Sequence, residues 1–460
     1  METKGVFFEG SFRSLGAKHN SEATYKIFLP NAKEGTEYGL VFSHDGFNIQ
    51  AAEAMQRLYE DGLAPPCVFV GVRPATLCAT LDGGFDRWMR QDNYDIFDPA
   101  YPSFIVDELI PYITEAHGLK ISASPDMHLA LGGSSGGISS FNMAWFRPDY
   151  FHRVYTSSPS FLSMNNGREM PALIRKCEAL PIRVWVEYSE NEPDDYFGSS
   201  YAAAIDFVRA LAFAGYDTDT RYFEGEGHCS RYHRVDAFEE ALGFLWRNWQ
   251  VEPIRAPRSS KRVEAIFPRG TSWEKTERSG FDAHKRARCE ALGGDYVIDG
   301  KEIFFERGGV KISVATFEKE LSAIALSSDG WRLYAASADL PCIYAHNIMP
   351  DGSLKGRYIH ASLHRNTDFV YAGAFDICVG AHDRLYAATE LGVQCVRTFG
   401  LIDVISPLLS RIIPEKIKIS MVGEEKKLVV LANNASYERI LREADGDIPV
   451  SAPAPKEYYD

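Results

Sequence analysis

The sequence predicts a protein of the α/β class, a sheet with flanking helices, followed by a smaller all-β domain. Three observations support this prediction. Over roughly the first 250 of the 460 residues, short β-rich runs alternate with helical stretches, which is typical of a sheet covered by helices. After Trp249 the chain becomes polar and rich in proline, which indicates a linker. From about Asp295 onward, short strands and turns follow one another.

Strands and helices alternate in the first part of the chain. The predicted strands are rich in β-branched and aromatic residues and cover 25–29, 40–43, 67–72, 127–131, 154–157, 182–187 and 220–223. Predicted helices include 101–117, which ends before Gly118, 138–146, which ends before Pro148, and 201–213, which ends at Gly215. Glycine and proline at such places are typical helix stops.

The sequence therefore predicts two domains. The α/β domain covers 1–250, a linker covers 251–285, a partial β-propeller-like domain covers 286–445, and a flexible tail covers 446–460. A turn followed by a strand recurs weakly in the second domain, at 299–305, 329–335, 382–387 and 425–430. Such repetition is typical of propeller blades. Because the spacing is uneven, an ordinary all-β domain remains the alternative.

Composition excludes several classes of function. The net charge of −14 argues against nucleic-acid binding, which needs a basic surface. No apolar run is long enough to span a membrane, and the first residues lack the pattern of a secretory signal, so we expect a cytoplasmic protein with no membrane partner. The eight cysteines lack C-x-x-C spacing, which indicates neither a zinc site nor a disulfide scaffold.

The motif Gly133-Ser134-Ser135-Gly136-Gly137 follows the predicted strand 127–131 directly and precedes a predicted helix. In this context G-x-S-x-G predicts a nucleophile elbow, a sharp turn from a strand into a helix that exposes its central serine. The predicted nucleophile is Ser135. Without its flanks, the same string would indicate only a tight turn.

An activated serine needs a base to take its proton and an acid to orient that base. In hydrolases with a nucleophile elbow, the three residues come along the chain in the order serine, acid, histidine. His228 follows a glycine-rich turn and is the predicted base, with His233 as a rival. Glu192 is the predicted acid. Carboxylates of the same loop remain open as alternatives, namely Glu190, Asp194 and Asp195.

The oxyanion hole needs two preorganised backbone N–H groups. Gly136, which follows the predicted nucleophile, should supply one, and the loop after the strand 40–43 should supply the other from Gly46 or Phe47. His44 lies in this loop but precedes the serine, so the chain order disfavours it as the base. Aromatic residues that are candidates for an acyl or sugar pocket are Trp88, Tyr94 and Tyr196.

The first 250 residues or so resemble the enterochelin esterase-like and esterase D-like α/β-hydrolases, which are related to feruloyl and acetylxylan esterases. The resemblance is most specific at 132–137, 144–149, 171–176 and 210–216. It implies Ser135 as nucleophile and Glu192 at the place of the family's usual Asp. The family's Gly-Gly-His segment corresponds here to Glu226-Gly227-His228.

The second half resembles the C-terminal part of the six-bladed propellers of the gluconolactonase and senescence-marker type, most clearly at 387–394. Only about 160 residues are present, too few for six blades. That family binds a divalent cation through Glu, Asn and Asp. Here Ser322 stands at the Asn position and Phe375 or Asp376 at the Asp position, so we expect no metal site and no cofactor.

The sequence therefore predicts a serine carboxylesterase, and the resemblance implies a feruloylated or acetylated carbohydrate as the substrate. A non-catalytic carbohydrate-binding or interaction protein with a decayed hydrolase fold is the alternative from another class, and a metal-dependent sugar lactonase is the third hypothesis. An incomplete propeller leaves strand edges unpaired, so we expect the second domain to pack on the esterase domain or on a second chain, which makes a homodimer possible.

Overall fold

The computed structural model describes residues 5–13, 21–33, 35–79, 81, 83–162, 164, 167–281, 284–365, 371–408 and 412–443. The chain forms two compact units. The first consists of Met1–Arg175 with Ala179–Arg258, and the second consists of Lys176–Glu178 with Ser259–Asp460. No helix in the described ranges is both long and apolar enough to cross a membrane.

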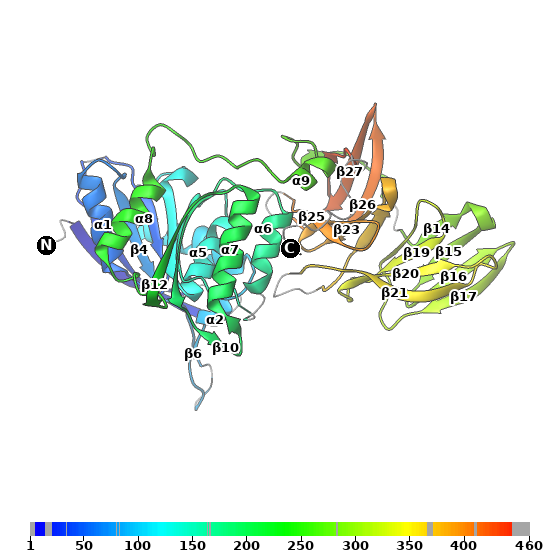
Figure 1. Cartoon of the computed structure of the whole chain (residues 1–460), viewed down its shortest axis with the longest axis horizontal. Coiled ribbons are helices and arrows are strands. Elements are labelled where there is room, and N and C mark those ends of the chain that lie inside the picture. Colours follow the sequence, from blue (N-terminus) through cyan, green and yellow to red (C-terminus); the bar gives the residue numbers. More distant parts are fainter. Residues whose placement is uncertain are drawn as a thin grey trace, which may run out of the picture. The chain divides into compact units, whose positions relative to one another are not determined.

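A ten-stranded sheet forms the centre of the first unit (Figure 1), and its main path runs β12-β9-β8-β7-β3-β4-β2-β5-β6, with β1 paired to β2. Its strands are β1 (Gly5–Arg13), β2 (Ser21–Pro30), β3 (Gly39–Ser43), β4 (Cys67–Val72), β5 (Thr76–Leu77), β6 (Arg87–Trp88), β7 (His128–Gly133), β8 (Arg153–Ser157), β9 (Arg183–Asn191) and β12 (Asp217–Gly227). From β12 to β4 all neighbours are parallel, whereas β2 is antiparallel to β4 and to β1. The carboxyl ends of the parallel strands therefore share one edge, where such sheets place their chemistry.

Helices connect these strands and cover the sheet. They are α1 (Ile49–Glu60), α2 (Arg90–Tyr94), α3 (Ala100–Ser103), a π-helix (Phe104–Leu109), α4 (Ile110–Ala116), α5 (Ser135–Phe146), α6 (Met170–Lys176), α7 (Ser200–Ala214) and α8 (Val235–Trp246), with 3₁₀ turns at Pro125–Met127 and Gly167–Glu169. A separate hairpin pairs β10 (Asp194–Asp195) with β11 (Gly198–Ser199).

The predicted strands of the first domain are confirmed, and most predicted helices are confirmed in place. The helix predicted over 101–117 is the exception, because it divides into α3, the π-helix and α4. Pro111 lies at the start of α4 and has no N–H to donate, so the regular hydrogen-bond ladder cannot run through it. Gly215 ends α7 in the left-handed conformation, with φ 77°, as its sequence position predicts.

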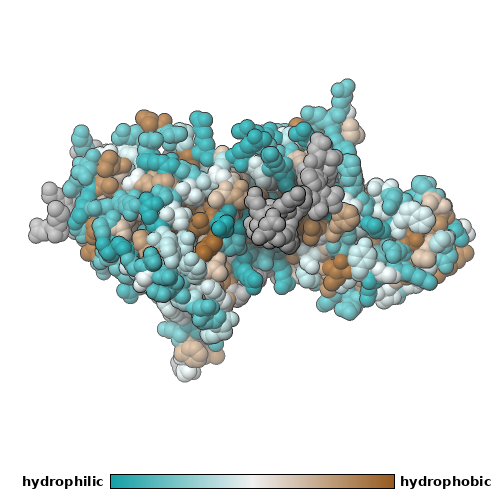
Figure 2. Space-filling model, viewed as in Figure 1, coloured by the Kyte–Doolittle hydropathy of each residue, from teal (hydrophilic) through white to brown (hydrophobic). Residues whose placement is uncertain are grey.

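The core of the first unit lies on both faces of the central strands. Every residue of β3, β4, β7 and β8 is buried, and so is every residue of α5. On another face α1 packs against α8 through apolar side chains that include Met55, Leu58, Leu242 and Trp246. On the face drawn in Figure 2 hydrophilic residues predominate, and hydrophobic residues form small separate patches. Burial of apolar side chains against the sheet is the main stabilising contribution.

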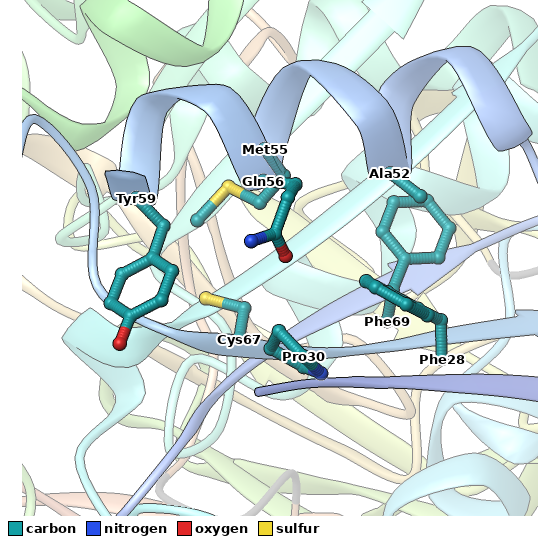
Figure 3. A pocket seen from close by; sticks show the side chains of 8 residues that line it. All are labelled: Phe28, Pro30, Ala52, Met55, Gln56, Tyr59, Cys67 and Phe69. Carbon is teal, nitrogen blue, oxygen red and sulfur yellow. The ribbon is translucent and has the colours of Figure 1, made fainter. Parts of the chain in front are cut away.

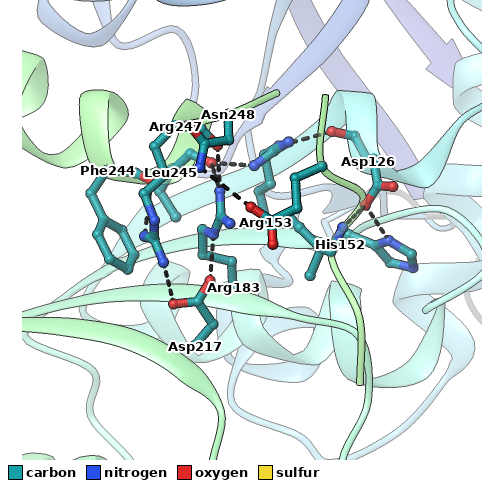
Figure 4. A network of polar contacts seen from close by, with 11 residues as sticks. Asp126, His152, Arg153, Arg183, Asp217, Phe244, Leu245, Arg247 and Asn248 are labelled. Atoms are coloured by element: carbon teal, nitrogen blue, oxygen red, sulfur yellow. Dashed lines mark hydrogen bonds and ion pairs between the residues drawn. The ribbon is translucent and has the colours of Figure 1, made fainter. Parts of the chain in front are cut away.

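Two buried arginines fasten the end of α8 to the sheet (Figure 4). Arg153 in β8 and Arg183 in β9 both donate to the carbonyl oxygen of Leu245 in the last turn of α8. The guanidinium of Arg153 also lies over the ring of Trp246, and burial lowers the pKa of Arg153 to about 9. Cations at the carboxyl end of a helix satisfy free carbonyl groups and oppose the helix dipole. The helix that follows the His228 loop is thereby held in place.

The second unit contains four antiparallel sheets of four strands each. The first comprises β14 (Arg286–Cys289), β15 (Gly294–Asp299), β16 (Glu302–Arg307) and β17 (Val310–Thr316); the second β18 (Ala323–Leu326), β19 (Arg332–Ala336), β20 (Cys342–Ile348) and β21 (Leu354–Ser362); the third β22 (Asp376–Val379), β23 (Leu385–Thr389), β24 (Gly392–Val396) and β25 (Ile402–Ser406); the fourth β13 (Glu274–Thr276), β26 (Lys416–Val422), β27 (Glu425–Ala432) and β28 (Ala435–Ile440). A short helix, α9 (Lys261–Ile266), and 3₁₀ turns at Glu290–Leu292 and Ala381–Asp383 complete it.

These sheets are arranged as the blades of a propeller. One edge strand of each sheet packs beside an edge strand of the next sheet, β14 beside β18, β18 beside β22 and β22 beside β26. The first sheet buries one face, with Tyr296 and Phe305, against the second sheet. Alternate residues carry ion pairs instead, in which Arg286 contacts Asp295 at 3.0 Å and Glu306 at 2.8 Å. A polar outer face is typical of the end repeat of such an array.

The second unit differs in two respects from the sequence prediction. Residues 251–285, predicted as a linker, contain α9 and β13, and β13 completes the fourth sheet by pairing with β28. The first copy of the repeat also lies one strand later in its sheet than the other copies do. Counted from the edge strands β14, β18, β22 and β26, the copies at 329–335, 382–387 and 425–430 lead into the next strand, whereas the copy at 299–305 leads into the strand after that. The predicted tail at 446–460 lies outside the described residues.

Candidate active site

A strained turn joins β7 to α5. Between Gly133, the last residue of β7, and Ser135, the first residue of α5, Ser134 has φ 58° and ψ −126°. A non-glycine residue rarely adopts this conformation, and a nucleophile elbow requires it. The N–H of Ser134 donates to the carbonyl oxygen of Ser157 at 2.8 Å, which holds the turn against β8. The residue at the elbow is therefore Ser134.

Ser135, the predicted nucleophile, lies one residue beyond the elbow. It is the first helical residue of α5 and only 4% exposed, whereas Ser134 is half-buried. The sequence contains two overlapping G-x-S-x-G registers, one flanked by Gly132 and Gly136 and the other by Gly133 and Gly137. Both fit the motif, so only the backbone conformation distinguishes them.

Glu192, the predicted acid, lies in the loop after β9, and its side chain is fully buried. One oxygen, Oε1, accepts hydrogen bonds from Ser158 Oγ at 2.6 Å and from the N–H of Ser189 at 3.0 Å. The other, Oε2, contacts Nδ1 of His228. Burial alone would raise the pKa of Glu192, but the hydrogen bonds from His228, Ser158 and Ser189 outweigh it and lower that pKa. Glu192 is therefore ionised at neutral pH.

His228, the predicted base, is partly exposed at the end of β12. Burial by itself lowers its pKa, but contacts with Cys229 and Glu192 outweigh burial and raise the pKa of His228 to about 10. The loop lies close to the elbow, because a Cβ added to Gly133 would be 3.0 Å from Cys229 Sγ. An ionised Glu192 can only accept, so the Nδ1 of His228 carries a proton in either charge state, and in the neutral imidazole Nε2 is free to act as a base.

The residues considered as alternatives to Glu192 and His228 either have other hydrogen-bond partners or lie on the exposed surface. Glu190 accepts from the N–H of Gly225 at 2.7 Å, and Asp194 and Asp195 lie exposed in the β10–β11 hairpin. His233 is exposed and contacts the ring of Tyr232. His44 is buried, which lowers its pKa to about 4, and its Nδ1 contacts the carbonyl oxygen of Leu131 at 3.1 Å. Of the four candidate carboxylates, all of them in the described part of the chain, Glu192 is the one that contacts His228, as the acid of a triad must.

Backbone strain is concentrated around this site. Among the described non-glycine residues of the first unit, those with positive φ are Asp45, Ser134, Ser158, Cys229 and Asn248. All of them except Asn248 follow the carboxyl ends of parallel strands, namely β3, β7, β8 and β12. Strained residues persist where the surrounding structure holds them, which is typical of active sites.

Because the elbow lies at Ser134 and not at Ser135, the backbone N–H groups predicted to form the oxyanion hole change as well. The N–H of Gly46 donates to the carbonyl oxygen of Val72 at 2.9 Å, so it is already occupied, contrary to its predicted role. Gly136 now lies two residues after the elbow serine, and the residue immediately after it is Ser135. The first N–H groups of a helix have no partner within that helix, so Ser135 and Gly136 both present donors there.

An ion pair lies beside the elbow. Arg90 contacts Asp45 through two hydrogen bonds, at 2.7 and 2.8 Å, and a Cβ on Gly136 would lie 3.0 Å from Asp45 Oδ2. Of the aromatic candidates, Tyr94 is fully buried and its hydroxyl accepts from the N–H of Asp45. Trp88, in contrast, is 64% exposed. Tyr196 is more exposed still, at 90%.

A buried carboxylate, which the sequence analysis missed, lies behind the elbow. Asp95 is fully buried, and neither of its oxygens has a hydrogen-bond partner of normal geometry in the described part of the chain. Burial raises the pKa of Asp95 to about 6, and the neighbouring Ser135 hydroxyl and Arg90 offset this only in part. Asp95 follows the short helix α2, and no motif marks it in the sequence.

A small pocket beneath α1 is a separate feature (Figure 3). Its lining residues are mostly apolar and include Phe28, Met55, Cys67 and Phe69. Burial raises the pKa of the Cys67 thiol, so that thiol stays protonated. None of the site residues lines this pocket, which therefore reflects packing between α1 and the sheet.

In the second unit, Ser322 and Asp376 stand at the positions that the sequence analysis compared with the metal ligands of a propeller, and both have hydrogen-bond partners within the protein. Asp376 accepts hydrogen bonds from His284 Nδ1 at 2.8 Å and from the N–H of Ile417 at 3.0 Å, and Ser322 Oγ donates to the carbonyl oxygen of Ala374 at 2.6 Å. The described residues contain no group of three or more His, Cys, Asp or Glu side chains that could hold a metal ion.

The sheet order and the elbow define the first unit as an α/β-hydrolase with a serine at the turn after β7. Residues 16–232 match the model of the Esterase family. This match covers most of the first unit, and the protein is a carboxylic-ester hydrolase.

Solved structures similar to the chain cover about half of it. A ferulic acid esterase is 18% identical with a TM-score of 0.39 over 53% of this chain and 98% of its own. The BES protein from Bacillus cereus is 19% identical with a TM-score of 0.38 over 52% of this chain and 95% of its own. The enterobactin esterase FES from Shigella flexneri is 15% identical with a TM-score of 0.39 over 54% of this chain and 60% of its own. No curated protein sequence matches the chain.

Proposed function

We propose that the first unit hydrolyses carboxylic esters through a triad of Ser134, His228 and Glu192. The observation that carries this proposal is the contact between the buried Glu192 and Nδ1 of His228, at the same sheet edge as the strained Ser134. This replaces Ser135 by Ser134 as the nucleophile and keeps the other two predicted residues.

In the first half of the reaction, Ser134 Oγ attacks the ester carbonyl carbon while its proton moves to Nε2 of His228. Glu192 stabilises the imidazolium that forms. The proton then passes to the alcohol oxygen as the ester bond breaks, and an acyl-enzyme on Ser134 remains. Water attacks this ester in the same way, with His228 first accepting and then returning the proton.

The N–H groups of Ser135 and Phe47 are the proposed oxyanion donors. Ser135 follows the nucleophile and begins α5, which supports the first assignment. Phe47 follows Gly46, whose own N–H is occupied, and no acceptor for the Phe47 N–H lies in the described part of the chain. Donors of this kind stabilise the negative charge that develops on the carbonyl oxygen.

We also propose an acylated carbohydrate, carrying a feruloyl or acetyl group, as the substrate. The resemblance to feruloyl and acetylxylan esterases supports this class. Two exposed aromatic side chains support it further: Trp88 lies two residues before Arg90, and Tyr196 lies four residues after Glu192. Aromatic rings exposed at a site offer flat apolar faces for rings of a ligand.

Hydrolysis of p-nitrophenyl acetate and methyl ferulate by the wild type, Ser134→Ala and Ser135→Ala tests the triad. We expect Ser134→Ala to lower kcat by about 10⁴-fold or more and Ser135→Ala by less than about 10-fold. The reverse pattern would assign the nucleophile to Ser135. For the substrate class, we expect acylated xylo-oligosaccharides to give a higher kcat/KM than the matching methyl esters, and equal values would exclude a sugar subsite.

A further inference from the structure

Ser158 lies at the end of β8 in a conformation that serine rarely adopts. Its φ is 47°, and the side chain is buried. The backbone N–H donates to the carbonyl oxygen of Glu187 at 2.6 Å, which fixes the strained residue against β9. Such strain costs free energy and needs support from its surroundings, so the position of this side chain is closely determined.

The Ser158 hydroxyl connects two parts of the proposed triad. It donates to Glu192 Oε1 at 2.6 Å and accepts from the N–H of Cys229, the residue after His228, at 2.9 Å. Because a hydroxyl has one proton and an ionised carboxylate can only accept, the directions of both bonds are fixed. One oxygen atom therefore joins the loops after β8, β9 and β12.

We propose that Ser158 is a positioning residue, which orients the Glu192 carboxylate and holds the His228 loop beside it. This inference rests on the proposed triad. With Oε1 held by Ser158 and by the Ser189 N–H, Oε2 is left facing Nδ1 of His228. Without the hydroxyl, the carboxylate loses one of its two anchors and the Cys229 N–H loses its acceptor.

A residue that only stabilises the fold would act independently of Glu192. The part of its effect that a residue exerts through Glu192 disappears once the carboxylate itself has been removed, because mutations in one network are not additive. The effect of Ser158 should therefore depend on Glu192, and this dependence separates positioning from plain stability.

A double-mutant cycle with Ser158→Ala and Glu192→Gln tests this on the full chain, with p-nitrophenyl acetate as the substrate. We expect Ser158→Ala to lower kcat by about 10–100-fold with little change in KM, as for the loss of a hydrogen bond to a charged group. In the Glu192→Gln background we expect the same substitution to change kcat by less than about 3-fold. The wild-type rise of kcat/KM with pH should also move to lower pH in Ser158→Ala.

Two further variants keep the test decisive. Ser158→Gly removes the hydroxyl but tolerates a positive φ, so it should lose activity as Ser158→Ala does without losing stability. Ser260→Ala removes a helix-capping hydroxyl from α9 in the second unit and should leave kcat unchanged. An unchanged kcat in both Ser158 variants, or an equal loss with and without Glu192, would overturn the positioning role. If Glu192→Gln alone kept full activity, the triad itself would fail instead.

Discussion

Gly132 and Gly136 approach each other so closely that a Cβ on Gly132 would lie 2.3 Å from the carbonyl oxygen of Gly136. These two glycines flank Ser134 at two residues on either side. A Cβ on Gly133, in the other register, would meet side-chain atoms first, at 3.0 Å from Cys229 Sγ. The backbone crossing that the elbow requires is thus made by Gly132 and Gly136, which agrees with the strained φ of Ser134.

Gly132→Ala should destabilise the first unit strongly, because its Cβ would meet backbone rather than a movable side chain. We expect a loss of about 3 kcal/mol or more, or failure to fold, measured by urea unfolding. Gly243 in α8 is the matched control, since a Cβ there meets nothing within 4 Å. In a helix interior, Gly243→Ala should stabilise by up to about 1 kcal/mol. Equal effects of the two substitutions would contradict this account of the elbow.

The pH dependence of activity should reflect the raised pKa of His228. The neutral imidazole is the active form, so kcat/KM should rise with pH through the alkaline range rather than near pH 6.5. The contact with Cys229 raises the pKa of His228 most, and the contact with Glu192 raises it next. Glu192→Gln removes the second contact, so the increase of kcat/KM should occur at lower pH. We also expect about 10³–10⁴-fold lower kcat. If Glu192→Gln left the pH dependence of kcat/KM unchanged, Glu192 would not be the residue that acts on His228.

Asp95 should make the folded state less stable as the pH rises. Its folded pKa, raised by burial to about 6, exceeds the value of 3.8 for an unperturbed Asp, so the folded state binds more protons between these values. Stability is therefore lost as the pH rises from about 4 to about 6, by about 2–3 kcal/mol at most. Asp95→Asn should remove this loss and stabilise the protein at pH 7 in urea unfolding. Asp61→Asn, at the exposed C-cap of α1 and not among the charges that act on Asp95, is the control and should leave the pH dependence unchanged.

Much of the fold and two members of the proposed triad could be predicted from the sequence. The apolar runs predicted the parallel strands, and the chain order pointed to Glu192 and His228. The nucleophile could not be fixed, because Ser134 and Ser135 each have glycines two residues away on both sides. Choosing between them needs φ and ψ, which residue types alone do not determine.

The roles of Asp95, Ser158 and Gly46 could not be predicted from the sequence for a different reason. No motif marks Asp95 or Ser158 in the sequence. Ser158 is distinguished by its hydrogen bonds to Glu192 and Cys229, which come from distant segments, and Asp95 by its lack of such a hydrogen bond in the described part of the chain. Gly46 has the right residue type for an oxyanion donor, but its N–H is occupied by Val72 on a neighbouring strand. Long-range hydrogen bonds of this kind follow from the tertiary structure and leave no local pattern.

Asp383 links two blades of the second unit. It lies between β22 and β23 of the third sheet, and its carboxylate accepts from the N–H of Ser328 at 2.8 Å and from the hydroxyl of Tyr334 at 2.7 Å, both in the second sheet region. Tyr334 is fully buried. Asp383→Ala would leave that hydroxyl and the N–H without an acceptor, which costs about 2–4 kcal/mol.

We expect this loss in the unfolding transition of the second unit, followed by urea unfolding, with the esterase activity unchanged. Asp299→Ala is the control, because the Asp299 side chain is 75% exposed and its contact with Lys311 is 3.9 Å long. An exposed pair of this kind contributes less than about 1 kcal/mol. Equal losses from the two substitutions would mean that the contact between the blades does not depend on Asp383. A loss confined to Asp383→Ala would show that adjacent blades are joined by buried carboxylates as well as by apolar packing.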